Sequence, residues 1–138
     1  MSKYVSYKTE FKDEQLLIEA LAALGYTAEY HENGVTTKNN FGETNQKVQI
    51  IVRQEELRRV KGTTVNLPAD LGFKKDKNGV YTAVINDYDR VHNKQGFVDQ
   101  VNEQYAIAGA KRTAKRLGLR FVKAEKKKGV TRMVYLPA

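Results

Sequence analysis

The 138-residue sequence contains no cysteine and only two prolines and two histidines. The absence of cysteine excludes disulfides, zinc–thiolate sites, iron–sulfur clusters and thiol catalysis. It fits a reducing compartment, so we expect a cytoplasmic protein. The sequence also lacks an apolar run at its N-terminus and any stretch close to the about 20 apolar residues that span a bilayer. We therefore expect neither secretion nor a membrane span.

Motifs for nucleophilic catalysis and phosphate binding are missing as well. The only serines, Ser2 and Ser6, lie near the N-terminus and outside any glycine-flanked elbow. We expect His31, at the end of a strand, and His92, in a polar connector, to be surface residues rather than bases or ligands. Neither a P-loop nor a dinucleotide-binding glycine motif occurs. The sequence therefore predicts no enzyme activity and no cofactor.

Three aspartates, Asp87, Asp89 and Asp99, supply the hard oxygen ligands that cations prefer. No loop with the ligand spacing of a cation site surrounds them. Ending a strand and bonding to turn backbone is the simpler role for such residues. We therefore expect no metal site.

Positive charge is concentrated in the second half of the chain. Residues 1–70 carry 9 Lys and Arg against 10 Asp and Glu, a net of −1. Residues 71–138 carry 15 against 6, a net of +9, and so account for the whole excess of +8. Such asymmetry indicates an anionic partner, because cations that neutralise phosphates release counterions. The alternative is that the charge only keeps a small domain soluble.

The first elements are clearly marked. Residues 4–11 alternate as a strand does and are rich in aromatic and β-branched types. Asp13 stands at the N-cap position of a helix of about 12 residues with one apolar stripe. Gly25 fits the left-handed position that follows a helix.

The next stretch reads as two strands separated by a loop. Residues 26–31 alternate between apolar and polar, and Asn33-Gly34 is a turn signal that closes this strand. Residues 36–46 are polar and predict a loop. Residues 48–52 form the most apolar short run in the chain and predict a central strand that is covered on both faces.

Residues 53–70 predict a turn of helix around residues 55–60 and an irregular segment after it. A hairpin follows, because Asn78-Gly79 supplies the positive φ angles of a tight turn. Residues 87–96 form a polar connector.

A second helix is predicted to run at most from Phe97 to Leu117, with Gly118 ending it. Its C-terminal part carries an apolar stripe that we expect to pack on the sheet, made of Ala106, Ile107, Ala110, Ala114 and Leu117. Val101 lies far from this stripe, which indicates a helix that is bent or begins later than Phe97. Strands over residues 121–125 and 130–136 follow.

Both halves of the chain share one layout: a strand, a helix that ends in Leu-Gly, and two more strands. We therefore predict a single α+β domain of pseudo-duplicated βαββ halves, about 1–52 and 71–138, joined by the irregular connection 53–70. The sheet should be antiparallel, with two helices packed on one face.

Five segments, spread over nearly the whole chain, carry a family resemblance. They are SYKTEFKDEQLLIEALAALGY, KVQIIV, LGFKKDKNGVYTAVINDYD, VNEQYA and GLRFVKAEKKKGVTRMVYL. In this order they resemble the uncharacterised conserved chloroplast (Ycf) family of algal plastids, cyanobacteria, other bacteria and phages. The chain departs from the family in its longer 53–70 segment and its more basic C-terminal part. The resemblance implies one small α+β domain in a soluble intracellular protein, and it implies no activity or catalytic residue.

The basic residues near the C-terminus are the clearest functional signal. The candidate phosphate-binding residues are Lys111, Arg112, Lys115, Arg116, Arg120, Lys123, Lys126, Lys127, Lys128 and Arg132. Tyr105 and Tyr135 are candidates for stacking on bases. We expect the lysines and arginines of the helix to point outward, opposite the stripe that packs on the sheet.

Two functions remain open from the sequence. One is a non-catalytic accessory role in binding DNA or RNA through the basic helix and hairpin. The other is a protein-binding adaptor that docks on a larger complex through exposed sheet surface or the 36–46 and 53–70 loops.

Overall fold

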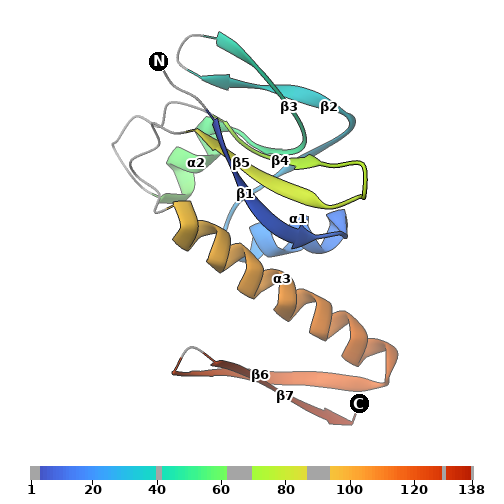
Figure 1. Ribbon diagram of the computed structural model, residues 1–138. Coiled ribbons are helices and arrows are strands. Elements are labelled where there is room, and N and C mark those ends of the chain that lie inside the picture. Colours follow the sequence, from blue (N-terminus) through green and yellow to red (C-terminus); the bar gives the residue numbers. More distant parts are fainter. Residues whose placement is uncertain (1–3, 40–41, 62–69, 87–93, 129, 138) are drawn as a thin grey trace.

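The computed structural model describes residues 4–39, 42–61, 70–86, 94–128 and 130–137 (Figure 1). In these ranges the elements, in chain order, are β1 (Tyr4–Phe11), α1 (Glu14–Ala23), β2 (Glu29–Asn39), β3 (Gly42–Val52), α2 (Gln54–Lys61), β4 (Leu71–Lys75), β5 (Tyr81–Asn86), α3 (Lys94–Arg116), β6 (Leu119–Lys127) and β7 (Val130–Pro137). The fold is α+β in a single domain, as predicted. Within the described ranges, no helix is both long and apolar enough to cross a membrane.

Five strands form one antiparallel sheet in the order β1-β5-β4-β3-β2. Cross-strand pairing places Ile50 opposite Phe73, and Phe73 opposite Ala83, so that an apolar row crosses the middle of the sheet. Ile50 and its neighbour Ile51 point to opposite faces and both are fully buried. The prediction that this run forms an interior strand covered on both faces is confirmed.

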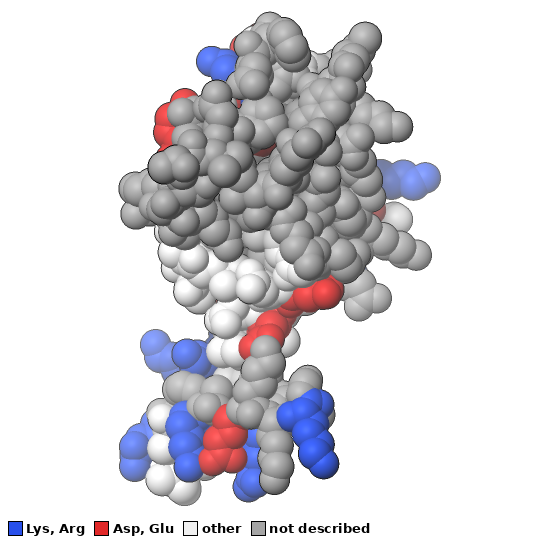
Figure 2. Space-filling view, turned by 90° about the vertical axis from the view of Figure 1, so that its left-hand side faces the viewer, with Lys and Arg blue, Asp and Glu red and all other residues white. Residues whose placement is uncertain are grey.

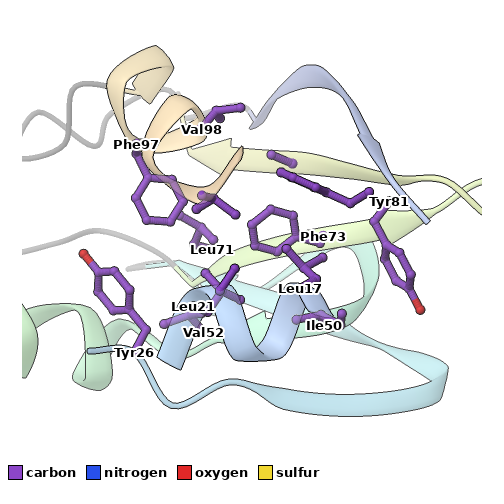
Figure 3. Close-up of a cluster of buried hydrophobic side chains, with 14 of the residues drawn as sticks. Leu17, Leu21, Tyr26, Ile50, Val52, Leu71, Phe73, Tyr81, Phe97 and Val98 are labelled. Carbon is purple, nitrogen blue, oxygen red and sulfur yellow. The ribbon is translucent and has the colours of Figure 1, made fainter. Parts of the chain in front are cut away.

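The main core lies between the sheet and the helices. Leu17 and Leu21 of α1 point toward Leu71 and Phe73 of the sheet, and Phe97 of α3 lies on the same cluster (Figure 3). These side chains are at most 3% exposed. Because two helices meet the sheet on this face, α1 and α3 are held by the same apolar cluster.

Helix α1 begins and ends where the sequence indicates. The side chain of Asp13 accepts a hydrogen bond from the backbone N–H of Leu16 at 3.0 Å, which satisfies one of the free donors of the first turn. Gly25, just past the helix, has a φ of 95°. The predicted cap and stop are confirmed.

The predicted loop at 36–46 is wrong. Within the described residues of this stretch, β2 continues to Asn39 and β3 begins at Gly42, so it forms the end of a long hairpin. Asn33-Gly34 does not close the strand but lies at a register shift inside β2, where Gly34 has a φ of 84°. The hydroxyls of Thr37 and Thr44 lie 2.6 Å apart, and the side chain of Thr37 is fully buried. A hydrogen bond between two threonines thus joins β2 and β3 in a stretch whose polar sequence had predicted a loop.

The predicted duplication holds for the order of elements but not for the sheet. β1, α1 and β2–β3 are matched in order by β5, α3 and β6–β7. However, β6 and β7 pair only with each other, in a separate two-stranded sheet. None of the described side chains of this hairpin is buried, whereas β3 supplies four of the core residues. A strand as charged as β6 has too few apolar side chains for the interior of the sheet.

Helix α2 confirms the turn of helix expected around residues 55–60. Asp70 links this helix to the sheet. Its carboxylate is 2% exposed and accepts hydrogen bonds from the backbone N–H groups of Lys38 and Gln54, at 3.0 and 2.9 Å. Arg53 lies 3.5 Å from the same carboxylate and also donates two hydrogen bonds to Glu29. The buried carboxylate of Asp70 thus links β2 and the first turn of α2 to the start of β4.

Gly72 should be intolerant of a side chain. A Cβ atom there would lie 2.6 Å from Cγ1 of Val48, a buried residue of the second apolar cluster of the sheet. We expect Gly72→Ala to lower the free energy of unfolding by about 1–3 kcal/mol, as overpacking does. Urea denaturation measures this change.

Gly109→Ala is the matched control. A Cβ atom there would lie an ordinary 3.7 Å from Leu16. Since alanine favours a helix interior, this variant should be neutral or more stable by up to about 1 kcal/mol. Equal losses for the two variants would contradict the packing argument.

The ion pair of Glu29 should make stability depend on pH in the acid range. Hydrogen bonds from Arg53 and then His31 lower the pKa of Glu29 from 4.5 to about 2. Because the folded-state pKa is the lower one, the stabilisation is complete above about pH 4.5 and is lost as the pH falls toward 2. The difference in unfolding free energy between the wild type and Glu29→Gln should shrink across this window.

Urea denaturation at a series of pH values tests this. Glu32→Gln, at an exposed position of the same strand, controls for the loss of a surface carboxylate. A Glu29→Gln difference that stays constant from pH 6 to pH 2 would refute the assignment.

Candidate functional site

Helix α3 projects from the body of the protein and carries the hairpin β6–β7 at its far end (Figure 1). It has 23 residues and, at about 1.5 Å per residue, is more than twice as long as α1 with its 10. Only its first half enters the core, through Phe97, Val98 and Val101. The prediction that the helix begins at Phe97 or later is wrong, because it begins at Lys94. Val101, which misses the predicted stripe, is fully buried in the core.

The two halves of α3 use different faces for packing. At 100° per residue, Ile107, Ala110 and Ala114 lie on roughly the opposite side of the helix from Phe97 and Val101. Ala114 is 5% exposed, and β6 packs against α3. The part of the predicted stripe around Ala114 therefore packs against the hairpin rather than the sheet, whereas Ile107 lines an open groove beside α1. The last member of the stripe, Leu117, is 70% exposed and its first, Ala106, is exposed as well, so the expectation that the whole stripe packs on the sheet is wrong.

The basic residues of α3 consequently face the body. Together with Gln15, Glu19 and Ala23 of α1, they line an open groove of about 620 Å³. We call them the groove group; it consists of Lys111, Arg112, Lys115 and Arg116. Lys111, Lys115 and Arg116 are exposed, as expected, but Arg112 is half-buried and pairs with Asp13. All four border α1, because they continue the side of the helix on which Phe97 and Val101 enter the core.

Arg112 and Tyr105 hold the two helices that border the groove. Nη1 of Arg112 lies 2.8 Å from Oδ2 of Asp13. The hydroxyl of Tyr105 accepts hydrogen bonds from the backbone N–H groups of Lys12 and Asp13, at 3.2 and 3.0 Å. Its ring packs against Phe11 with centroids 4.9 Å apart. Tyr105 is thus engaged in packing and hydrogen bonding, which leaves it poorly placed to stack on a base.

Asp13 receives partners from two directions. Burial acts to raise its pKa, but the N–H of Leu16 and the guanidinium of Arg112 together lower the pKa of Asp13 below its ordinary value. The carboxylate therefore remains charged at neutral pH. It connects the first turn of α1 to the fifth turn of α3.

The remaining basic residues lie on the hairpin. Those with described side chains are the hairpin group, which consists of Arg120, Lys123, Lys128 and Arg132, all of them exposed. Lys123 pairs with Glu125 at 2.8 Å. The side chains of Lys126 and Lys127, two further candidates, lie outside the described residues.

The hairpin has two distinct faces. Alternation along β7 puts Met133 and Tyr135 on one face, where both are half-buried and the Tyr135 hydroxyl lies 3.9 Å from the Met133 sulfur. Arg132 and Leu136 lie on the other face and are exposed. With α3 between the hairpin and the body (Figure 1), the groove group and the hairpin group lie on different sides of the projecting end.

Basic side chains gather at the projecting end of the molecule. These Lys and Arg side chains lie below a narrow waist, with few acidic side chains among them (Figure 2). The acidic residues of α3, Asp99 and Glu103, belong to its first half. Within the described residues, neither Lys115 nor Arg116 forms an ion pair. The groove is therefore suited to bind an anion.

The sequence did not reveal the α1 side of this groove. Gln15, Glu19 and Ala23 are spaced four residues apart and form an exposed stripe, which alone indicates only a solvated face. Because α3 crosses α1, this stripe faces the groove group and forms the second wall of the groove. His31 is bonded to Glu29, while His92, Asp87, Asp89 and residues 62–69 lie outside the described residues.

Comparisons with known proteins add one finding. A family model described as a protein of unknown function (DUF1257) matches residues 20–134. Neither the curated proteins nor the solved structures yielded a significant match.

The structural role of Tyr105 can be tested by removing its hydroxyl. We expect Tyr105→Phe to lower the free energy of unfolding by about 1 kcal/mol, because two N–H groups lose their acceptor while the ring contact with Phe11 remains. Urea denaturation followed by circular dichroism measures the loss.

Tyr30→Phe is the matched control, because Tyr30 is 42% exposed and its hydroxyl can bond to water in both the folded and the unfolded protein. It should cost less than Tyr105→Phe. An unchanged stability for Tyr105→Phe would show that its hydroxyl does not hold α1 to α3.

Proposed function

Because this chain belongs to the family of proteins of unknown function (DUF1257), whose description assigns no activity, we propose from its geometry that it is a non-catalytic module that binds nucleic acid. The binding surface is the projecting end, made of the second half of α3 and the hairpin. The observation that carries the proposal is the groove group, which lines one concave site together with a single carboxylate, Glu19. Arg112 is already paired with Asp13, whereas Lys115 and Arg116 form no ion pair within the described residues. A cytoplasmic location and the likeness to the chloroplast (Ycf) family remain predictions.

Nucleic acid fits this charge pattern better than a small anion does. Lys111 and Lys115, like Arg112 and Arg116, are separated by about 6 Å along the helix, so they form a row rather than a single pocket. The hairpin group continues the positive charge beyond the groove. A row of cations favours a polymer with regularly spaced charges, because each neutralised phosphate adds counterion release.

One observation favours the alternative, a protein-binding adaptor. Three large apolar side chains near the projecting end are exposed: Leu117 by 70%, Val122 by 41% and Leu136 by 44%. Apolar side chains that cluster on a surface mark contact sites for other proteins. The loop at 36–46, which the adaptor hypothesis used, is a strand hairpin in its described part and gives this alternative no support.

Charge reversal tests the proposal. Fluorescence anisotropy with labelled mixed-sequence DNA and RNA should show binding that weakens by about 50- to 150-fold between 50 and 200 mM salt if four phosphates are neutralised. Lys115→Glu/Arg116→Glu should abolish most of this binding, since both side chains are exposed and line the groove.

Lys74→Glu/Lys77→Glu is the matched control. It makes the same change in net charge at exposed positions around the β4–β5 turn, and it should keep most of the affinity. Absence of binding to both polymers at low salt would reject the proposal and favour the adaptor. An equal loss in the control would reject the projecting end as the site.

A further inference from the structure

We infer that the groove between α1 and α3 holds a single strand of nucleic acid and excludes a duplex. This inference rests on the function proposed above and assigns a substrate class to its site. In the bound state the phosphates lie along α3 and the bases turn toward α1. Three features of the lining support it: its depth, its size and the different chemistry of its two walls.

The lining changes character with depth. Lys111, Lys115 and Arg116 are exposed and therefore lie at the rim, whereas Gln104, Ile107 and Ala108 are half-buried. Charged phosphates are stabilised at the rim, where they keep part of their hydration. The deeper residues present apolar surface and an amide, which suit a sugar or a base. A ligand that uses the whole groove must therefore carry both phosphate and accessible bases.

The size of the groove excludes a duplex from its deeper part. Its volume of about 620 Å³ lies in the range of about 300–1,000 Å³ that holds one small organic ligand. A groove of this volume can hold a short segment of a single strand. A duplex keeps its bases inside and presents phosphates on either side of a major groove about 12 Å wide. It can meet the cations at the rim but cannot reach Gln104 or Ala108.

The two walls differ in charge, which orients the strand. The α3 wall carries the groove group, and the α1 wall carries Glu19 and the amide of Gln15. Phosphates are attracted to α3 and repelled by Glu19. A carboxylate and an amide are instead groups that bind base edges, where glutamate accepts from exocyclic amino groups. The strand therefore binds with its backbone on α3, and Glu19 favours bases that carry such amino groups.

Variants that fill the groove without changing its charge distinguish binding inside the groove from general electrostatic attraction to the basic residues. Ala23→Leu and Ala108→Leu each add a branched apolar side chain to the lining. Ala23 is exposed at the end of α1, so its replacement should not disturb folding. Ala22→Leu, at the exposed neighbouring position that lines a different small pocket, is the matched control.

Anisotropy is measured with a labelled 12-nucleotide strand and with the duplex of the same sequence at one salt concentration. We expect the wild type to bind the strand about tenfold more tightly than the duplex. Ala23→Leu and Ala108→Leu should weaken strand binding by about fivefold to tenfold and leave duplex binding unchanged. Ala22→Leu should behave as the wild type.

Equal or tighter binding of the duplex would overturn the inference, and so would unchanged strand binding by both groove-filling variants. If Lys115→Glu/Arg116→Glu still abolished binding in that case, the proposed function would survive while the groove would fail as its site. Absence of binding to any strand or duplex would remove both.

Discussion

The burial of the first half of α3 in the core is the constraint on which the rest of the molecule depends. Phe97, Val98 and Val101 join the core, so the direction of the helix is set by the packed face of the sheet. The helix is much longer than the core needs, and its second half therefore extends beyond the body. The position of the hairpin, the groove and the basic residues all follow from this overhang.

The groove depends on contacts that are not themselves basic. Tyr105 and Arg112 both contact the residues immediately before α1. The Tyr105 hydroxyl accepts hydrogen bonds from the N–H groups of Lys12 and Asp13, and Arg112 pairs with the Asp13 carboxylate. These contacts lie where α3 leaves the core, and they fix the spacing between the two walls. Cations near the end of α3 also interact favourably with the helix dipole. The same residues can thus stabilise the helix end and line a groove. The first role depends on their position near the C-terminus of α3, and the second depends on the face of α3 on which they lie.

Local signals in the sequence were sufficient for most of the elements. The cap at Asp13 and the stop at Gly25 depend on one or two residues and their own backbone, so they can be predicted without the fold. The hairpin at Asn78-Gly79 was predicted as well, but not its turn: residues 76–80 separate β4 from β5, and Gly79 has a positive φ whereas Asn78 does not. The apolar run around Ile50 was equally clear, because a strand buried on both faces has no polar alternation.

The sequence could not predict which element packs against each face of a helix or strand. The wheel of α3 shows an apolar stripe around Ala114, but nothing in it says whether a sheet or a hairpin will cover that stripe. The long β2–β3 hairpin was missed for a related reason, since Thr37 is stabilised by a partner, Thr44, that is polar itself. For the candidate site, the basic residues were identifiable but the wall formed by α1 was not, because it depends on how two distant helices cross.

The hairpin β6–β7 also bears on the dynamics of the protein. None of its described side chains is buried, and its main packing partner within the described residues is α3. Backbone amides in such a unit are protected by local pairing alone, so their hydrogens should exchange with solvent through openings that cost far less free energy than global unfolding. The end of the molecule that carries its excess of positive charge should therefore open and close while the five-stranded sheet stays intact.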